Sequence, residues 1–386
     1  AVGARDFLVA YNINLNTTST RRANSVAFDI REKGRVKREG GKITGKPVLD
    51  ENGEKVWEPG ALKCVKGIGW YIEEYGIAQV SVNLTNISVT PVHKAFDEAC
   101  KSAEKRGLRV TGSELVGLIP LKGMLEAGKY FLRKQNRSTG IPEKELIKIA
   151  VKSLGLDDLY KFQPEEKIIE YKLADKNKKK LADMTVSDFS DETASESPAP
   201  GGGSVSAYMG SLGAALGTMV ANLSSHKRGW DDRCQEFSEW AEKGIECQSE
   251  LTRLVDEDTD AFNKIMEAFK MPKQTDEEKA ARKEAIQEAT KNAIMVPFRI
   301  MKTAHKSMEV IKAMAETGNP NSVSDAGVGA LAARAAVRGA FLNVKINSED
   351  LDDKAYVDDT IKKGEEILKD AEKKEEEIIK IVENKM

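Results

Sequence analysis

The sequence has 386 residues, 40% hydrophobic and 32% charged, a composition that excludes wholesale disorder and collagen-like repeats. At roughly 100–200 residues per domain, it predicts two or three domains. The net charge of −2 hides an asymmetry. Residues 1–182 carry 33 basic and 23 acidic side chains, a net of +10, and residues 183–386 carry 27 and 39, a net of −12. The basic half would suit an anionic ligand.

Three features of the sequence indicate the cellular compartment and whether a metal is bound. Four cysteines without a Cys-x-x-Cys pair do not form a disulfide framework, and three scattered histidines argue against a catalytic metal. No basic region followed by an apolar run opens the chain, so we predict no signal peptide and a cytoplasmic protein. Because Ala1 runs almost directly into strand-like sequence, we interpret the chain as cut from something longer.

The first third alternates strand and helix patterns. Alternating apolar residues predict strands over 7–15, 64–71, 78–87 and 108–116. Helical spacing predicts helices over 20–32, 92–105, 120–133 and 143–154. Asn52-Gly53 between short apolar pairs indicates a small hairpin. The order of elements is that of the ferredoxin-like split βαβ unit, and we assign residues 1–165 to this α+β domain, with helices on one face of an open sheet.

The remainder is a linker followed by helices. Residues 166–182 are interpreted as a linker, because one short lysine run is more typical of a solvated segment than of a nucleic-acid tail. Helical patterns then cover 183–193, 204–225, 233–269, 275–317, 324–344 and 352–384. Pro297 is expected to kink the helix that contains it. Long helices with short connections predict an all-α up-and-down bundle over residues 183–386.

A glycine-rich segment precedes the second of these helices. Gly201, Gly202 and Gly203 leave backbone N–H groups open to a ligand at the positive end of the helix dipole, and Ser204 is a natural N-cap. A flexible linker with an ordinary cap is the alternative. Residues 197–225 contain no charged side chain, so a membrane span has to be weighed. Their small residues instead favour a helix packed closely against others and an oligomer, and we predict no membrane span.

Asp258 is the strongest single candidate for a catalytic residue. It lies four residues after Leu254 and four before Phe262, so its carboxylate falls on the apolar stripe of its helix, whereas Asp256 and Thr259 fall on the outer, solvated face. Burial raises the pKa of a carboxyl group, which suits proton transfer at neutral pH. A structural ion pair with Arg334 or Arg338 is an equally weighted alternative. His305 is interpreted as a packed core histidine.

Several segments resemble a known family. GARDFLVAYNINL (residues 3–15), VKGIGWYIEEYGIAQVSVNL (65–84) and GSELVGLIPLKGML (112–125) resemble the C-terminal subdomain of glutamate formiminotransferase. APGGGSVSAYMGSLGAALGTMV (199–220), LVDEDTDAF (254–262) and SDAGVGALAARAAVRGAFLNVKIN (324–347) resemble formimidoyltetrahydrofolate cyclodeaminase. In this order they resemble the bifunctional formiminotransferase-cyclodeaminase family over nearly the whole chain.

The resemblance implies an activity and site residues. It implies conversion of 5-formimidoyltetrahydrofolate to 5,10-methenyltetrahydrofolate and ammonia, in histidine degradation, with Asp258 as the catalytic acid/base. Polyglutamylated tetrahydrofolate would be substrate and carrier, without a metal. Residues 201–204 would line the pterin or its glutamate carboxylate. The weaker candidates for polar pterin contacts are Asp325, Arg338, Asn343 and Asn347. The family also implies a homo-oligomer built from dimers.

The transferase part is expected to be incomplete. The family's transferase has a further N-terminal subdomain with its catalytic histidine, and none of His93, His226 and His305 matches it. The resemblance therefore implies half of a split or truncated transferase, and leaves open whether the other half acts in trans. Two alternatives stay open. The helical half could be a methenyltetrahydrofolate cyclohydrolase, for which Asp258 would also serve, or the first half could be a non-catalytic folate-tethering or assembly module.

Overall fold

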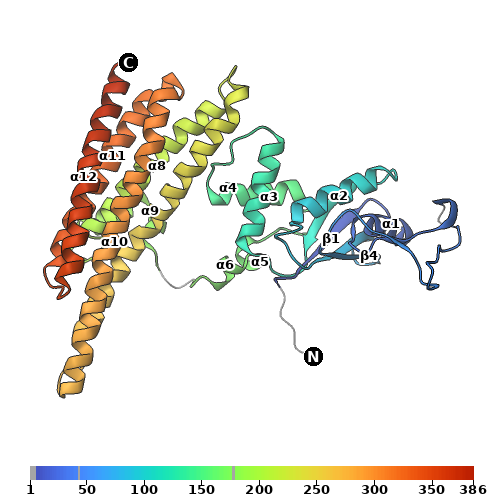
Figure 1. The fold of residues 1–386 in the computed structure, drawn as a ribbon, viewed down its shortest axis with the longest axis horizontal. Helices are drawn as coiled ribbons and strands as arrows, with labels where there is room; N and C mark the ends of the chain where they lie inside the picture. Colours follow the sequence, from blue (N-terminus) through green and yellow to red (C-terminus); the bar gives the residue numbers. More distant parts are fainter. Residues whose placement is uncertain (1–5, 42–43, 176–178) are drawn as a thin grey trace. The chain divides into compact units, whose positions relative to one another are not determined.

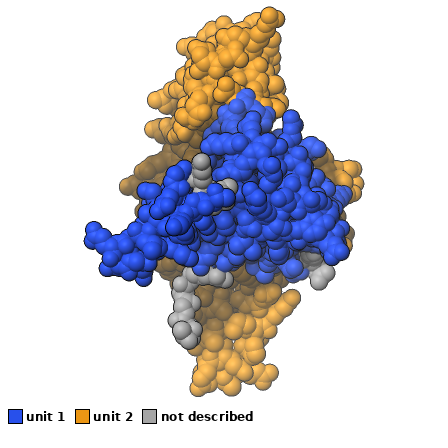
Figure 2. All heavy atoms as spheres, turned by 90° about the vertical axis from the view of Figure 1, so that its right-hand side faces the viewer, with its two compact units in different colours: residues 1–135, 142–175 blue, residues 136–141, 176–386 orange. Residues whose placement is uncertain are grey.

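The computed structural model describes residues 6–41, 44–175 and 179–386, which form two compact units. Unit 1 comprises residues 1–135 and 142–175, and unit 2 comprises residues 136–141 and 176–386 (Figure 2). The interpretation of the chain start and the part of the predicted linker at residues 176–178 lie outside the described residues.

Unit 1 is built on a four-stranded sheet (Figure 1). Its strands are β1 (Val9–Leu15), β4 (Val65–Ile72), β5 (Ile77–Leu84) and β6 (Val110–Leu115). They pair antiparallel in the order β4-β5-β1-β6, with Ile13 opposite Val80 on one side and Ser113 on the other. All four strands lie within the predicted segments or one residue beyond them.

The two faces of this sheet differ in chemistry because strand side chains alternate. Tyr11, Ile13 and Leu15 are fully buried in the core beneath the helices. The intervening Asn14 accepts a 2.8 Å hydrogen bond from Gln79 on the opposite face. The sheet therefore buries one apolar face and carries a polar network on the other.

Helices α1 (Thr20–Ile30) and α2 (Val92–Glu104) lie against the apolar face of the sheet. Helices α3 (Leu121–Lys134) and α4 (Glu143–Leu154) pack mainly on each other, and their buried side chains join the same core. Ser19 caps α1, whose buried stripe consists of Ala23, Val26, Ala27 and Ile30. The short helices α5 (Pro164–Lys167) and α6 (Ile169–Leu173) follow. The segment predicted as a linker, residues 166–182, therefore begins with helical residues. The α+β character expected for the first half is confirmed.

A short ribbon projects between α1 and β4. Strand β2 (Arg35–Val36) pairs antiparallel with β3 (Trp57–Glu58). Between them, Leu49 and Lys55 form a bridge, and Gly53 donates a 3.0 Å hydrogen bond to the Asp50 carbonyl with φ +77°. The hairpin that Asn52-Gly53 indicated is thus confirmed, since a positive φ suits glycine.

Unit 2 is helical in its described residues (Figure 1). Its helices are α7 (Val186–Thr193), α8 (Gly202–Ser225), α9 (Cys234–Phe269), α10 (Asp276–Thr317), α11 (Val323–Ser348) and α12 (Lys354–Glu383). Pro297 lies inside α10. Thr275 and Glu278 form a capping box that begins α10. The expectation of helices after the α+β half is confirmed, and no helix of the described chain has the length and apolarity of a membrane span.

Small residues let α8 approach its neighbours closely. A Cβ on Gly213 would lie 2.8 Å from the carbonyl oxygen of Gly329 in α11, and one on Gly217 would lie 2.9 Å from Ile311 in α10. Real Cβ contacts of this length do not occur, so glycine is required for the packing. The small-residue pattern of α8 therefore serves packing within unit 2.

Residues 136–141 belong to unit 2 through contacts with its helices. The Thr139 N–H donates a 3.0 Å hydrogen bond to Ser238 in α9, and Asn222 in α8 donates a 2.8 Å bond to the Gly140 carbonyl. A Cβ on Gly140 would lie 2.2 Å from the backbone of Ala241, so this segment lies flat against α9.

Candidate active site

The carboxylate of Asp258 in α9 lies against the first turn of α8. A Cβ on Gly203 would lie 2.2 Å from Asp258 Oδ1 and 2.4 Å from Oδ2, which is well inside van der Waals contact. The absence of a side chain at Gly203 therefore lets the carboxylate reach the backbone of α8. This turn has N–H groups without intrahelical acceptors and the positive end of the helix dipole.

Ser204 links the two helices at the same point. Its hydroxyl donates a 2.8 Å hydrogen bond to the Val255 carbonyl and lies 3.4 Å from Asp258 Oδ2 and 3.2 Å from Thr259 Oγ1. Burial raises the pKa of Asp258, and hydrogen bonds from the Ser204 side chain and backbone lower it in part. The result is a carboxyl group that holds its proton to a higher pH than usual, which is the property required of an acid/base group.

The neighbouring carboxylates of α9 are neutralised by arginines. Arg299 donates a 2.6 Å bond to Glu250 and also bonds Glu257, which accepts a 2.7 Å bond from Arg253. In the parts of the chain that the structure describes, no arginine or lysine forms an ion pair with Asp258. Asp258 therefore differs from Glu250 and Glu257 in being held by a hydroxyl and backbone without a cation.

The alternative ion pairs predicted for Asp258 are wrong. Arg338 lies 3.1 Å from Glu372, and Arg334 lies 3.4 Å from Glu375, both in α12. The helix spacing placed both arginines on one face correctly, but that face of α11 meets α12, and the sequence does not show which helices are neighbours.

The structure brings one further candidate to the glycine turn. The side chain of Asn343 is the nearest group to a Cβ built on Gly202, at 3.3 Å from Nδ2, and it donates a 3.0 Å hydrogen bond to the Gly339 carbonyl in its own helix. Gly201 is the N-cap residue of α8, with φ −97°, and Gly202 is exposed. The predicted Ser204 cap is wrong, because the helix begins three residues earlier than the apolar pattern.

The other candidates lie elsewhere in unit 2. Asn347 donates a 2.7 Å hydrogen bond to the Ala293 carbonyl of α10, and Arg338 pairs with α12. Asp325 lies in the first turn of α11, eighteen residues from Asn343, which corresponds to about 27 Å along a helix. Within one chain, Asp325 therefore does not share a ligand-sized site with Asn343.

Two residues expected to be solvated are not. Asp256 accepts a 2.6 Å hydrogen bond from the Leu181 backbone, and burial raises its pKa. Thr259 contacts Ser204. Both predictions were wrong because a helical wheel cannot show that the segment before α7 and the start of α8 cover this side of α9. Thr259 is the site residue missed, and its only sequence signal was its position beside Asp258.

His305 pairs with charged groups at the edge of the bundle. Its Nε2 lies 2.6 Å from Asp370 and 3.1 Å from Lys374. The prediction of a packed core histidine is thus corrected to a partly exposed histidine that contacts Asp370 and Lys374. In the described residues no group of three or more histidine, cysteine, aspartate or glutamate side chains is placed to hold a metal.

The fold and the site together define a class: an α+β unit followed by a helical bundle in which a half-buried acid faces a glycine-rich helix start. Comparison with known proteins gives the particular family. A family model described as formiminotransferase domain matches residues 10–174, and one described as formiminotransferase-cyclodeaminase matches residues 185–366. The chain belongs to the formiminotransferase-cyclodeaminase family.

Individual relatives agree with this assignment. The formimidoyltransferase-cyclodeaminases of Gallus gallus and Mus musculus are each 38% identical, over 99% and 96% of this chain, which spans 67% and 64% of their lengths. The methenyltetrahydrofolate cyclohydrolase of Methylorubrum extorquens is 40% identical over 48% of this chain and 90% of its own length. The formiminotransferase match gives no support to the expectation that this portion is incomplete.

Proposed function

We propose that the chain is a folate-dependent one-carbon enzyme of histidine degradation, and that unit 2 is a formimidoyltetrahydrofolate cyclodeaminase. It would convert 5-formimidoyltetrahydrofolate to 5,10-methenyltetrahydrofolate and ammonia. The observation that carries this proposal is the half-buried Asp258 carboxyl group, which lies against Gly203 and Ser204 and has a raised pKa. The family membership supports the substrate class.

The reaction needs one proton to leave and one to arrive. N10 of the folate attacks the amidine carbon, and N10 must lose its proton as the new C–N bond forms. The amino group then leaves the tetrahedral centre as ammonia, for which its nitrogen must gain a proton. Asp258 can accept the first proton and donate the second, because a carboxyl group of raised pKa exchanges protons near neutrality. Its negative charge, restored at the end, offsets the methenyl cation.

The substrate would lie over the start of α8. The backbone N–H groups at Gly201, Gly202 and Gly203 offer donors to the pterin or its glutamate carboxylate. Asn343 would supply a polar contact from α11, since its amide borders Gly202. Asp325, Arg338 and Asn347 stay weaker proposals, because they lie away from this turn or have partners in neighbouring helices.

The decisive experiment follows both products at once. The purified chain is mixed with 5-formimidoyltetrahydrofolate, and methenyl absorbance and ammonia are recorded together. Equal rates of both signals support the cyclodeaminase. Neither signal, from folded protein, would refute it.

The alternative is a methenyltetrahydrofolate cyclohydrolase. It is favoured by the Methylorubrum extorquens relative, which is similar over the helical half. Asp258 would serve there by activating water. Hydrolysis of 5,10-methenyltetrahydrofolate without any ammonia release from the formimidoyl compound would select this alternative.

For residues 1–165, we propose a glutamate formimidoyltransferase portion of ferredoxin-like architecture, followed by a linker to residue 182 and the cyclodeaminase from residue 183. The formiminotransferase match and the strand order β4-β5-β1-β6 support this division. A non-catalytic folate-tethering or assembly module is the alternative. To test this alternative, residues 1–165 are made alone and assayed for polyglutamate binding and self-association. If they show neither, the alternative is excluded.

We also propose a cytoplasmic homo-oligomer built from dimers. The described cysteines are all free, which suits a reducing compartment. The packed helices α8 and α11 expose large apolar side chains: Leu212 and Leu223 are each 47% exposed, Leu342 is 60% and Ile346 is 64%. These residues recur at helical spacing on each helix, and such a face is typical of a protein–protein contact.

A further inference from the structure

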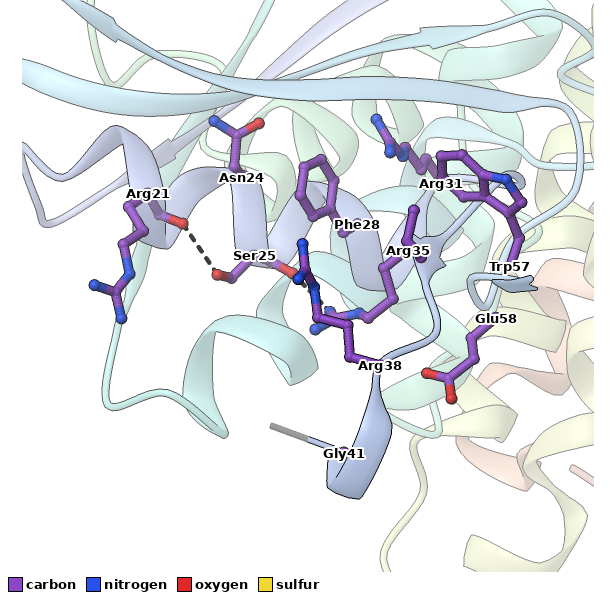
Figure 3. A pocket seen from close by; sticks show the side chains of 11 residues that line it. Arg21, Asn24, Ser25, Phe28, Arg31, Arg35, Arg38, Gly41, Trp57 and Glu58 are labelled. Atoms are coloured by element: carbon purple, nitrogen blue, oxygen red, sulfur yellow. Dashed lines mark hydrogen bonds between the residues drawn. The ribbon is translucent and has the colours of Figure 1, made fainter. Parts of the chain in front are cut away.

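Charged side chains lie in different surroundings in the two units. In unit 1, arginines line a cavity of about 580 Å³ between α1 and the β2–β3 ribbon (Figure 3). In unit 2, the carboxyl group of Asp258 lies against a helix turn and a hydroxyl group. The protonation of Asp258 therefore depends on where the neighbouring hydroxyl groups point their hydrogens.

The charged neighbours of Asp258 in α9 are directed to other partners. Asp256 accepts a hydrogen bond from the backbone of the segment before α7, and Glu257 pairs with Arg299 of α10. At this turn α8 presents glycines and a hydroxyl group, and α11 presents the neutral amide of Asn343. In the described chain, burial and hydrogen bonds from α8 thus set the pKa of Asp258, without a charged group.

Three oxygen atoms surround the hydroxyl group of Ser204. This residue is fully buried, and its Oγ lies 2.8 Å from the Val255 carbonyl, 3.2 Å from Thr259 Oγ1 and 3.4 Å from Asp258 Oδ2. A hydroxyl group donates one hydrogen and accepts at two lone pairs. The carbonyl can only accept and is the nearest of the three, so the Ser204 hydrogen points to Val255. Thr259 then donates to Ser204.

This arrangement suits a protonated Asp258 better than an ionised one. The carboxylic acid can donate to the remaining lone pair of Ser204, which completes all three contacts. An ionised carboxylate has no hydrogen and would face that lone pair at 3.4 Å. Ionisation therefore favours a turn of the Ser204 hydrogen to Asp258, which takes the side-chain donor away from the Val255 carbonyl.

A second serine–threonine pair on the same two helices shows a different arrangement. Ser211 in α8 and Thr252 in α9 lie seven residues further along this line of contact, and their hydroxyl oxygens are 2.8 Å apart. Here the threonine donates a 2.9 Å hydrogen bond to the carbonyl of Gln248, four residues earlier, so the serine donates to the threonine. A threonine at this position can therefore occupy the carbonyl and leave the serine hydrogen for another acceptor.

We propose that Thr259 is a positioning residue for the acid/base group. When Asp258 loses its proton, Ser204 turns its hydrogen from the Val255 carbonyl to the carboxylate. Thr259 then turns its own hydrogen from Ser204 to that carbonyl. Asp258 thus has a hydrogen-bonding partner in both protonation states, as a group that accepts one proton and donates another requires. The role in turnover rests on the proposed function, whereas the exchange of hydrogen bonds does not.

The test is a titration of Asp258 in the full chain. The carboxyl signals of aspartate-labelled protein are followed by ¹³C NMR as the pH is changed, and Asp258→Asn identifies the signal. Thr259→Val removes the hydroxyl group at nearly constant shape. The ionised form then loses a bond of the 2.9 Å kind seen at Gln248, whereas the protonated form loses only the 3.2 Å one. The pKa of Asp258 should therefore rise by about 0.4, which is about 2.5-fold in the ionisation constant.

Three variants separate this role from simple packing. Thr259→Ser keeps the hydroxyl group and should restore the wild-type titration. The matched control Thr252→Val removes the corresponding hydroxyl group of the second pair and should leave the pKa of Asp258 within about 0.1 of wild type. In a Ser204→Ala background, Thr259→Val should have no further effect, because Thr259 acts through Ser204.

Four results would overturn the proposal: an unchanged pKa in Thr259→Val, no rescue by Thr259→Ser, an equal rise in Thr252→Val, or the same rise in the Ser204→Ala background. Thr259→Ala repeats the measurement if Thr259→Val does not fold. The titration needs no substrate. A wild-type chain that fails to turn over 5-formimidoyltetrahydrofolate would therefore refute the proposed function and leave this test intact.

Discussion

Replacing Gly203 by alanine tests the candidate active site most directly. The new Cβ would lie 2.2 Å from Asp258 Oδ1, whereas ordinary contact begins at 3.4 Å. The carboxylate must therefore move by roughly 1 Å, and a misplacement of about 1 Å can cost about 100-fold in rate. We expect Gly203→Ala to lower the turnover of 5-formimidoyltetrahydrofolate by about that factor.

The stability of this variant should change little. Overpacking costs about 1–3 kcal/mol, and alanine in a helix gains about 0.5–1 kcal/mol over glycine, so the two effects partly cancel. Circular dichroism and a thermal melt would show a folded protein. A loss of activity in a folded variant would then report the position of Asp258.

A matched variant in the same turn supplies the control. A Cβ on Gly201 would meet only the Pro198 carbonyl oxygen, at 3.9 Å, and its φ of −97° suits alanine. Gly201→Ala keeps the backbone N–H that the proposed substrate site uses and leaves Asp258 in place, so it should keep near-wild-type turnover. If the segment were only a flexible linker, Gly203→Ala would behave like this control, and turnover within threefold of wild type would refute the reasoning.

Three further predictions concern the same unit. Asp258→Asn should abolish turnover yet raise the melting temperature at pH 7.5. The reason is that a raised pKa makes ionisation of Asp258 cost stability as pH rises above about 4. The gain in melting temperature should vanish near pH 4, and a lower melting temperature at pH 7.5 would contradict the prediction. Ser204→Ala removes a hydrogen bond that lowers the pKa of Asp258, so the rising limb of the pH–rate profile should move to higher pH, and an unmoved limb would exclude this role. Leu342→Glu/Ile346→Glu should convert the proposed oligomer to smaller species at micromolar concentration in sedimentation, and an unchanged sedimentation coefficient would contradict a contact through this face.

Local pattern was sufficient for the main elements of the fold, although it missed the short helices α5 and α6. The strands and helices of unit 1 follow from alternation and helical spacing, because each such pattern has one way to bury its apolar side. Tyr11, Ile13 and Leu15 could be assigned to the core in this way, and so could the alanine-rich stripe of α1. The Asn52-Gly53 turn was equally local, since its backbone conformation is a property of the dipeptide.

Local sequence pattern could predict only part of the candidate site. Asp258 stood out because a carboxylate on an apolar stripe is costly, and the glycine-rich segment stood out by composition. Nothing in either segment shows that they meet, or that Gly203 is the residue whose missing side chain makes room. That contact joins residues more than fifty positions apart, and it exists only once α8 lies on α9.

The errors have the same origin. A helical wheel shows which residues share a face but not what covers that face, so Asp256 and Thr259 were placed in solvent and Arg338 beside the wrong helix. The sequence by itself determined the elements, their order and the unusual residues, since these depend on neighbours along the chain. Which of those residues share a site was decided by helix packing, since proximity in space depends on every intervening element.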